Sequence, residues 1–581
     1  MSSASSCSRK KPSARAVSCP VILIPARLSI PAVLLVCLLP VCLRAAAPSL
    51  KGVFPPGGMR GTEMEVTLEG QMEKGQVWIE GEGVTFSAPD EKGLVKAKIT
   101  PEAAPGIRLL RVFNVEGVSE AVRFVVGTLP EMKETQPNHA PDKAMMLEKL
   151  PVCVNGKIDK GGDMDHFAFS LKKGQSLRLE LLAYTLGSPI DPLLHVLDEK
   201  GTRLATASDG RNLDPVLTFT APADGHYVAQ IAGFTHPPAA DVSFTGGSTV
   251  VYRLALQPGP VATRLFPAAV SVEKPTSLTR RGVGLSKETA AYEVPKTAAP
   301  ATGRIASLAM PDGILPVDVL VSTAVPQVES EPNDKADQAK GAAPLPAVFG
   351  GALMARGDSD RFAVPVKKGQ KLRAEVFSQR LGLPLDAALK VFDETGKVLG
   401  SADDQKDHGD PVVNWTAAAD GMHQVMVSDQ FHRGGEAHEY VLEVAEVTPA
   451  FEVTLPDAKP LKAVPGKKVE LKVSVKLLDG WKDPLVVRVT GLTKPHLISK
   501  IEMPVPAKGG DVTFAIEPMA EFPAGMHPFH VVVCKPDGSE CQVATYDLRG
   551  ENRRGTSQSD RDETLWLMTT SMFVGPPSPD Q

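Results

Sequence analysis

Short runs of alternating polar and apolar residues are the dominant pattern along this chain. The segments 63–70 and 468–475 alternate with a period of two, which is typical of a strand that buries one face. The 581 residues include 51 prolines and 50 glycines, and these residues favour turns between such runs. Beyond residue 47 the sequence shows no long helical periodicity. The pattern therefore predicts an all-β protein, and the length predicts several domains.

Part of the sequence occurs twice. The pattern Gly-Asp-x-Asp-x-Phe stands at residues 162–167 and again at 357–362, and Lys-Lys-Gly-Gln stands at 172–175 and again at 367–370. The two motifs are equally spaced in both places, and an Asp-Gly pair follows later in each copy. An internal duplication of this kind predicts two domains of one fold.

The two copies, residues 134–257 and 327–446, resemble the bacterial pre-peptidase C-terminal domain family. A Glu-Pro-Asn-Asp opening at 331–334, the Gly-Asp turn, the Lys-Lys-Gly-Gln hairpin and a late Asp-Gly follow one another in the family's order, and Tyr252 and Tyr440 close the two copies. Members of the family are small β-sandwich modules often appended to secreted peptidases and collagenases. The resemblance implies that each copy, called here the first and the second repeat, is a β-sandwich.

The rest of the chain also reads as strands. Residues 48–127 resemble an immunoglobulin-like module of the IPT/TIG type, and residues 260–326 echo both of its ends, which we interpret as a degenerate second copy. Residues 450–548 predict a further immunoglobulin-like domain, and residues 549–581 predict a mobile tail with a possible edge strand. The expected architecture is a tandem array of β-sandwich modules of jelly-roll or immunoglobulin-like type.

The N-terminal segment 1–47 has the features of a secretory signal peptide. It holds six Lys or Arg and no acid, then an apolar run over 30–43 and three alanines at 45–47. Pro31 and Pro40 interrupt the run, which is too short for a stable membrane span. We therefore expect an exported protein that is periplasmic, on the cell surface or extracellular.

The charge of the exported chain limits its partners. Without the six basic residues of the signal, 57 basic residues face 68 acidic ones, a net charge near −11. An acidic surface disfavours nucleic acid and anionic lipid. We expect an extracellular protein or polysaccharide as partner.

Two cysteines flank a turn near the C-terminus. Cys534 and Cys541 enclose Lys-Pro-Asp-Gly-Ser-Glu, a turn signal between strand-like runs. In an oxidising compartment they could bridge across a hairpin. A reduced buried pair is the alternative.

Oxygen-bearing side chains are concentrated at the start of the second repeat. If the opening segment folds back onto the Gly-Asp turn, five carboxylates and an amide converge and repel one another unless a cation lies among them. Calcium takes six to eight oxygen ligands and tolerates irregular geometry. The candidate ligands are Glu329, Glu331, Asn333, Asp334, Asp358 and Asp360.

The resemblance points to the same metal. In collagen-binding members of the family, a similar opening and later aspartates bind calcium, which implies that role for all the candidates except Asp358. Asp358 is added from its proximity alone. The alternative is that these acids cap turns and stay solvated.

The first repeat provides an internal comparison. It keeps Glu134 and Asn138, but Gln136 replaces the second glutamate and His139 replaces the aspartate that follows the asparagine. With two acids missing, we expect no metal there and a structural role for Asp163 and Asp165.

No catalytic motif accompanies these modules. The sequence has neither a Gly-x-Ser-x-Gly elbow nor a His-Glu-x-x-His helix, so we expect a non-catalytic binding protein. An accessory component of a subtilase-type peptidase and a structural spacer or assembly subunit are the alternatives. Phe377 and Trp415 are candidates for an aromatic ligand face like that of the collagen-binding members, although core packing explains them better.

Overall fold

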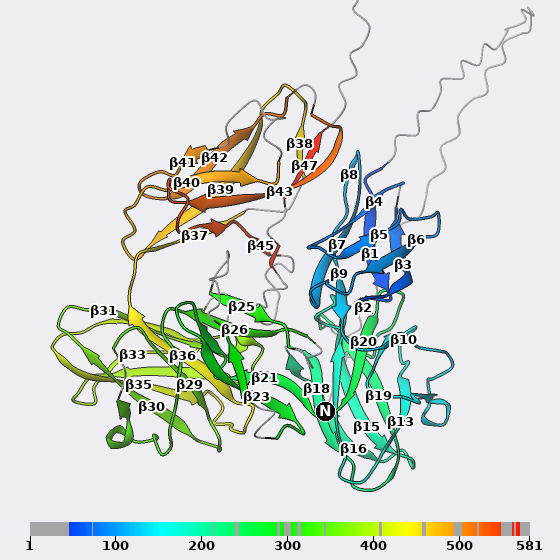
Figure 1. Cartoon of the computed structure of the whole chain (residues 1–581), viewed down its shortest axis with the longest axis horizontal. Coiled ribbons are helices and arrows are strands. Elements are labelled where there is room, and N and C mark those ends of the chain that lie inside the picture. Colours follow the sequence, from blue (N-terminus) through cyan, green and yellow to red (C-terminus); the bar gives the residue numbers. More distant parts are fainter. Residues whose placement is uncertain are drawn as a thin grey trace, which may run out of the picture. The chain divides into compact units, whose positions relative to one another are not determined.

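The computed structural model describes residues 46–569, except 73, 212, 239–242, 287–290, 296–303, 311–314, 342–343, 406–408, 456–459, 493–501, 520–521, 548–560 and 563–564. The predicted signal peptide therefore lies outside the described residues except at its last two positions, and so does most of the predicted tail. The described helical elements are three short 3-10 turns, η1 (Pro141–Lys143), η2 (Ala336–Gln338) and η3 (Gln379–Leu381). The chain is all-β and is built of tandem β-sandwiches (Figure 1).

Residues 49–127 form two sheets around one core. One sheet has the order β1 (Ser49–Phe54), β3 (Glu63–Gln71), β6 (Leu94–Ile99) and β5 (Val84–Phe86), and the other has the order β2 (Gly57–Met59), β9 (Val122–Gly127), β7 (Gly106–Asn114) and β4 (Gln76–Ile79), with β8 (Gly117–Val118) beside β7. Every second side chain of β6 is buried. Val66, Leu110 and Phe124 are fully buried in this core, and each contributes about 1.5–3 kcal/mol through burial.

The first repeat is a sandwich of a six-stranded and a five-stranded sheet. The six-stranded sheet has the order β10 (Glu131–Lys133), β12 (Val152–Lys157), β20 (Val251–Pro258), β14 (Ser176–Leu182), β18 (Asp214–Thr220) and β17 (Gly210–Arg211), and the other has the order β11 (Met145–Met146), β13 (Asp165–Leu171), β19 (Gly225–Thr235), β15 (Ile190–Asp198) and β16 (Arg203–Ala207). Its core is rich in large side chains such as Phe167, Phe169 and Leu179, all fully buried.

The second repeat has the same strand order. Its sheets are β27 (Gln327–Val328), β29 (Ala347–Ala352), β36 (Glu439–Glu446), β31 (Lys371–Phe377) and β34 (Val412–Thr416), and β28 (Lys340–Gly341), β30 (Ser359–Val366), β35 (Gly421–Asp429), β32 (Ala387–Phe392) and β33 (Val398–Ala402). The first repeat adds β17 at one edge. Two stretches of similar sequence thus fold into one topology.

The way each repeat begins brings its acidic opening segment onto the sandwich. In the second repeat β27 pairs in parallel with β29 in one sheet, and β28 pairs in parallel with β30 in the other. The chain between β27 and β28 therefore crosses from sheet to sheet. In the first repeat β10 and β11 do the same with β12 and β13.

Two smaller three-stranded sheets lie between the repeats in sequence. They are β21 (Val261–Phe266), β23 (Thr276–Val283) and β24 (Ala291–Val294), and β22 (Ala269–Ser271), β26 (Val317–Ser322) and β25 (Ile305–Leu308). The parallel pairing of β22 with β26 corresponds to that of β2 with β9. The interpretation of residues 260–326 as a degenerate copy stays a prediction that this pairing favours.

The last sandwich has its own core. One sheet has the order β37 (Ala450–Thr454), β39 (Val469–Leu478) and β42 (Gly510–Ile516). The other has the order β38 (Leu461–Ala463), β47 (Leu565–Thr569), β43 (Gly525–Cys534), β40 (Val486–Thr490) and β41 (Glu502–Pro504), with β44 (Gln542–Val543) beside β43. A separate pair is formed by β45 (Tyr546–Asp547) and β46 (Arg561–Asp562). The strand expected at an edge, β47, lies instead between β38 and β43, because Leu565 and Leu567 are buried in this core. Cys534 and Cys541 form a disulfide, which decides between the two alternatives.

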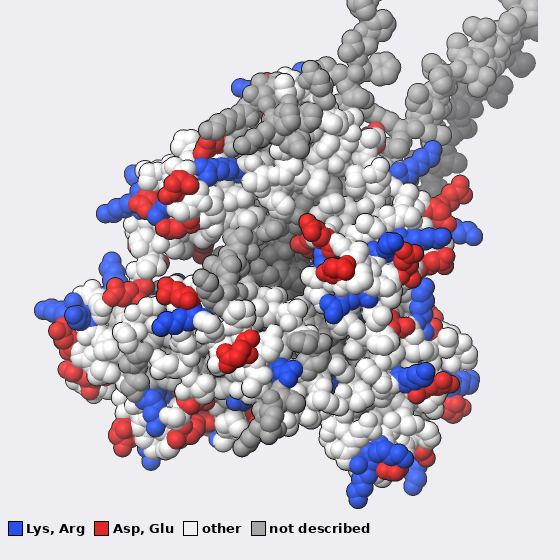
Figure 2. Space-filling view, viewed as in Figure 1, with Lys and Arg blue, Asp and Glu red and all other residues white. Residues whose placement is uncertain are grey.

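The surface carries charges of both signs. On the face shown in Figure 2, acidic and basic side chains are interspersed. Within the described part of the chain, no helix is both long and apolar enough to cross a membrane.

Candidate metal centre

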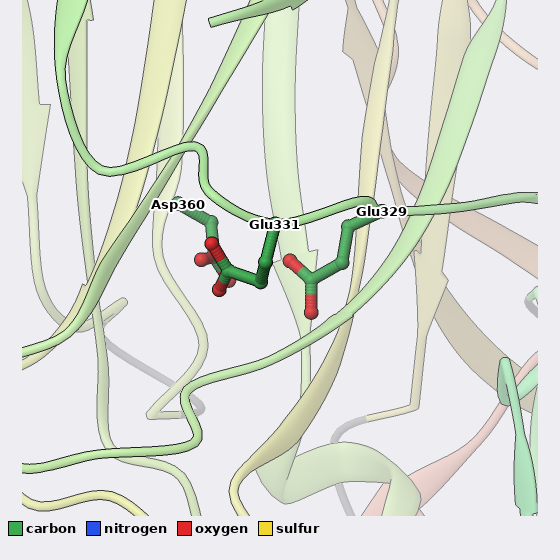
Figure 3. Close-up of side chains that lie close together, drawn as sticks. All are labelled: Glu329, Glu331 and Asp360. Atoms are coloured by element: carbon green, nitrogen blue, oxygen red, sulfur yellow. The ribbon is translucent and has the colours of Figure 1, made fainter. Parts of the chain in front are cut away.

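Three carboxylates of the second repeat meet where its opening segment crosses the sandwich. Glu329, Glu331 and Asp360 each offer an oxygen within 4.8 Å of the other two. Figure 3 shows the Glu331 carboxylate beside that of Asp360, with Glu329 next along the segment. Glu329 and Glu331 come from the stretch after β27, and Asp360 comes from β30. The predicted folding of the opening segment onto the Gly-Asp turn does bring these acids together.

Asn333 completes this group with an amide. Its side chain is fully buried, and its Nδ2 donates to Glu329 Oε2 at 3.3 Å. Its side-chain oxygen faces only acceptors, and if the amide is turned over, the nitrogen donates to Glu331 Oε2 and Asp360 Oδ1, both at 3.0 Å. The turned orientation satisfies the amide, so that the Asn333 side chain links the carboxyls of Glu331 and Asp360 by hydrogen bonds.

Tyr440 on β36 also belongs to the site, and the sequence reasoning did not assign it there. Its hydroxyl donates to Asp360 Oδ2 at 2.6 Å and lies 3.5 Å from Glu329 Oε2. Gly351 makes room for it, since a Cβ there would lie 2.3 Å from the hydroxyl oxygen. The signal that could have found it is the tyrosine that closes both repeats.

The raised pKa values of the three carboxyls show that little positive charge lies near them. Burial raises the pKa of Glu329 and of Glu331, and burial together with the Glu329 charge strongly raises the pKa of Asp360. The backbone N–H of Ala352 donates to Glu329 Oε1 at 2.6 Å and offsets part of this cost. Asp360 is buried, Glu329 is half-buried and Glu331 is exposed, and the backbone N–H of Asn333 donates to Glu331 Oε2 at 2.9 Å. The buried part of the group needs either a proton or a cation to offset its charge.

The two remaining candidates lie beside the group rather than in it. Asp358 Oδ2 accepts from the backbone N–H of Met354 at 2.7 Å and so caps a turn. Asp334 is exposed, and it lies close enough to Asp358 to help raise the pKa of that carboxyl, whose largest cause is burial. The structure therefore brings together Glu329, Glu331, Asn333 and Asp360, with Asp334 and Asp358 as neighbours.

The first repeat has the same contact of a tyrosine with an aspartate and a glutamate, but with one acid fewer. Tyr252 donates to Asp165 Oδ2 at 2.7 Å and lies 3.2 Å from Glu134 Oε2. Gln136 Nε2 donates to Asp165 Oδ1 at 3.5 Å, in the place of the Glu331 carboxylate. Among the described residues, the three acids of the second repeat are the one group of His, Cys, Asp or Glu side chains close enough to hold a metal ion.

The two aromatic candidates for a ligand face are core residues. Phe377 is 1% exposed and packs beneath the guanidinium groups of Arg304 and Arg380. Trp415 is 7% exposed, and its indole N–H donates to His423 Nδ1 at 3.0 Å. The preferred explanation, core packing, is confirmed.

Comparison with known proteins gives one family match. Residues 163–233, within the first repeat, match the model of the bacterial pre-peptidase C-terminal domain. A probable subtilase-type serine protease of Deinococcus radiodurans is 35% identical over 74 residues, which is 13% of this chain and 10% of that protein. The match thus covers a small part of both proteins.

Solved structures give only distant likenesses. The pre-peptidase C-terminal domain of a Bacillus anthracis collagenase is 13% identical, with a TM-score of 0.16, and its whole length aligns with 21% of this chain. The Bacteroides ovatus protein SGBP-B of a mixed-linkage glucan utilization locus is 9% identical, with a TM-score of 0.13, over 64% of this chain and 72% of that one. The surface layer protein SbsC, domains 1–6, is 9% identical, with a TM-score of 0.13, over 86% of this chain and 54% of that one.

Proposed function

We propose that this chain is an exported, non-catalytic binding protein in which a calcium ion fastens the opening segment of the second repeat. The observation that carries the metal site is the meeting of three carboxylates, since Glu329, Glu331 and Asp360 each offer an oxygen within 4.8 Å of the other two. Burial raises the pKa of each of them, and a cation among their oxygens would offset that cost.

The donor set fits calcium better than a transition metal. The three carboxylates that meet offer only oxygens, and the Asn333 amide would add an oxygen if it turned towards the ion, whereas zinc and copper prefer nitrogen or sulfur. Asp334 and Asp358 are near enough to add negative charge at Glu331. Calcium tolerates such a mixed and irregular shell.

The ion would act mechanically. Glu329 and Glu331 belong to the segment that leaves β27, and Asp360 belongs to the sandwich itself. A cation between them ties the entry of the repeat to its body, and the preceding sheets then keep a fixed direction relative to it. A stiff series of modules favours binding because less conformational freedom is lost on association.

The partner we propose is an extracellular protein or polysaccharide. The predicted signal peptide supports an exported protein, and the net negative charge of the rest of the chain disfavours nucleic acid. The stretch that matches the Deinococcus protease favours a second candidate, an accessory component of a secreted subtilase-type peptidase. A spacer or assembly subunit is the third.

Calorimetric melting of the mature chain tests the metal site. We expect calcium added after chelator treatment to raise the melting temperature of one transition, and we expect Glu331→Gln, which copies Gln136 of the first repeat, to abolish that rise. Glu148→Gln, at an exposed position, is the matched control and should keep it. If calcium leaves every transition of the unmodified chain in place, the metal site is wrong.

A further inference from the structure

The first repeat holds two carboxyl groups against a single phenol. Tyr252 Oη lies 2.7 Å from Asp165 Oδ2 and 3.2 Å from Glu134 Oε2, and Tyr252 and Asp165 are fully buried. A phenol has one hydrogen and can donate it to one carboxylate only. The second contact is favourable only if that carboxyl carries its own hydrogen and donates it to the phenol oxygen.

The remaining contacts that the structure gives Glu134 and Asp165 come from no positively charged side chain. The Lys157 backbone N–H donates to Glu134 Oε1 at 2.8 Å, but the Lys157 ammonium pairs with Asp159 at 3.4 Å. Asn138 Nδ2 lies 3.5 Å from Glu134 Oε2. Among the described residues, no basic side chain has an ion pair with Glu134 or Asp165.

The charged and titratable groups around the pair favour a bound proton. Asp163 and Asp159 add negative charge near Asp165 and Glu134 respectively. The neighbouring ring of His166 is engaged elsewhere, by the Asn138 carbonyl at 3.0 Å and by the Gln230 amide at 2.9 Å. His139 is exposed.

We propose that the first repeat fastens its opening segment, residues 134–139, with a proton held between Glu134, Asp165 and Tyr252, where the second repeat uses a cation. The hydrogen on Glu134 donates to the phenol oxygen, and the phenol donates to Asp165. Gln136 in place of a third acid removes the negative charge that would make a divalent cation preferable. The two repeats then respond to different signals, acidity in the first and calcium in the second.

The direction of the pH response follows from the same contacts. Burial, with the charge of Asp165, raises the pKa of Glu134 to about 8 from its usual 4.5, and burial also raises the pKa of Asp165. A carboxyl whose folded pKa is raised stabilises the fastened state most below its unfolded pKa and loses that contribution as the pH rises towards the folded value. The fastened state should therefore weaken by up to about tenfold per pH unit between about pH 5 and about pH 8, then level off.

Hydrogen exchange of the full chain, in the presence of chelator, tests this proposal. The quantity is the protection factor of peptides covering residues 134–139, corrected for intrinsic exchange, from about pH 5 to about pH 9. We expect it to fall at least tenfold across that range in the unmodified chain. Glu134→Gln, whose amide donates to the phenol at any pH, should remove most of the dependence, and Glu148→Gln should leave it unchanged.

Two results would overturn the proposal. One is a protection factor of the unmodified chain that is constant with pH, which needs no variant to be informative. The other is a folded Glu134→Gln chain whose segment is unprotected at every pH, because a negative charge rather than a hydrogen would then be what the site requires.

Discussion

The hydroxyl of Tyr440 donates to Oδ2 of Asp360 at 2.6 Å although the two residues are 80 positions apart. The first repeat has the same bond, from Tyr252 to Asp165. In both repeats a further glutamate of the opening segment reaches the same hydroxyl. The two repeats differ at the next acidic position of the opening segment, which is Glu331 in the second repeat and Gln136 in the first. The two kinds of closure that we propose rest on that difference.

Restoring the missing acids should create a second cation site. We expect the double variant Gln136→Glu with His139→Asp to bind two calcium ions per chain where the unmodified chain binds one, because the first repeat then has the opening acids of the second. Isothermal titration calorimetry gives the stoichiometry. A stoichiometry that stays at one would mean that these positions do not decide metal binding.

The small residue beside Tyr440 should be essential for the site. Gly351→Ala places a Cβ 2.3 Å from the Tyr440 hydroxyl oxygen and 2.7 Å from Glu329 Oε2. We expect a loss of about 1–3 kcal/mol in the stability of the second repeat and weaker calcium binding, measured by chemical denaturation and calorimetry. Gly225→Ala, where a Cβ meets only one atom at 4.0 Å, should be close to neutral. Equal effects of the two substitutions would contradict the packing argument.

A buried carboxylate outside the metal site should be important for the fold of the first repeat. Asp214 is fully buried and accepts from the backbone N–H groups of Ala183, Tyr184 and Thr185, each at 2.8 Å. Asp214→Ala leaves these donors without a partner, and we expect a loss of about 3 kcal/mol or more. The exposed Asp209→Ala is the control. Melting of the chain without residues 1–47 should show the loss in one transition, and an unshifted melting profile would refute it.

Much of the fold follows from local sequence, and much of the site does not. The alternation in 63–70 predicts β3, and the repeated motifs predict two sandwiches of one topology. The position of β47 inside a sheet depends instead on tertiary packing, because Leu565 and Leu567 are buried in the core of the last sandwich. The contact of Tyr440 with Asp360 likewise exists only after strands distant in sequence have packed together. Asp358 was placed in the site by proximity along the chain, but its carboxylate turns to the backbone of Met354.

Reduction should weaken the last sandwich alone. The Cys534–Cys541 disulfide closes a short loop, with a sequence separation of 7, and cross-links of that size stabilise by about 2 kcal/mol. We expect the transition of this domain to move to lower temperature in reducing buffer, while the calcium-sensitive transition stays in place. A calcium-sensitive transition that moved on reduction would show that the two regions unfold together.

The most direct measurement of the central claim is the calcium stoichiometry, by isothermal titration calorimetry, of the chain without residues 1–47, with and without Glu331→Gln. The account predicts one bound ion per chain and no binding to the variant. Binding of the same strength to both proteins, or to neither, would contradict it.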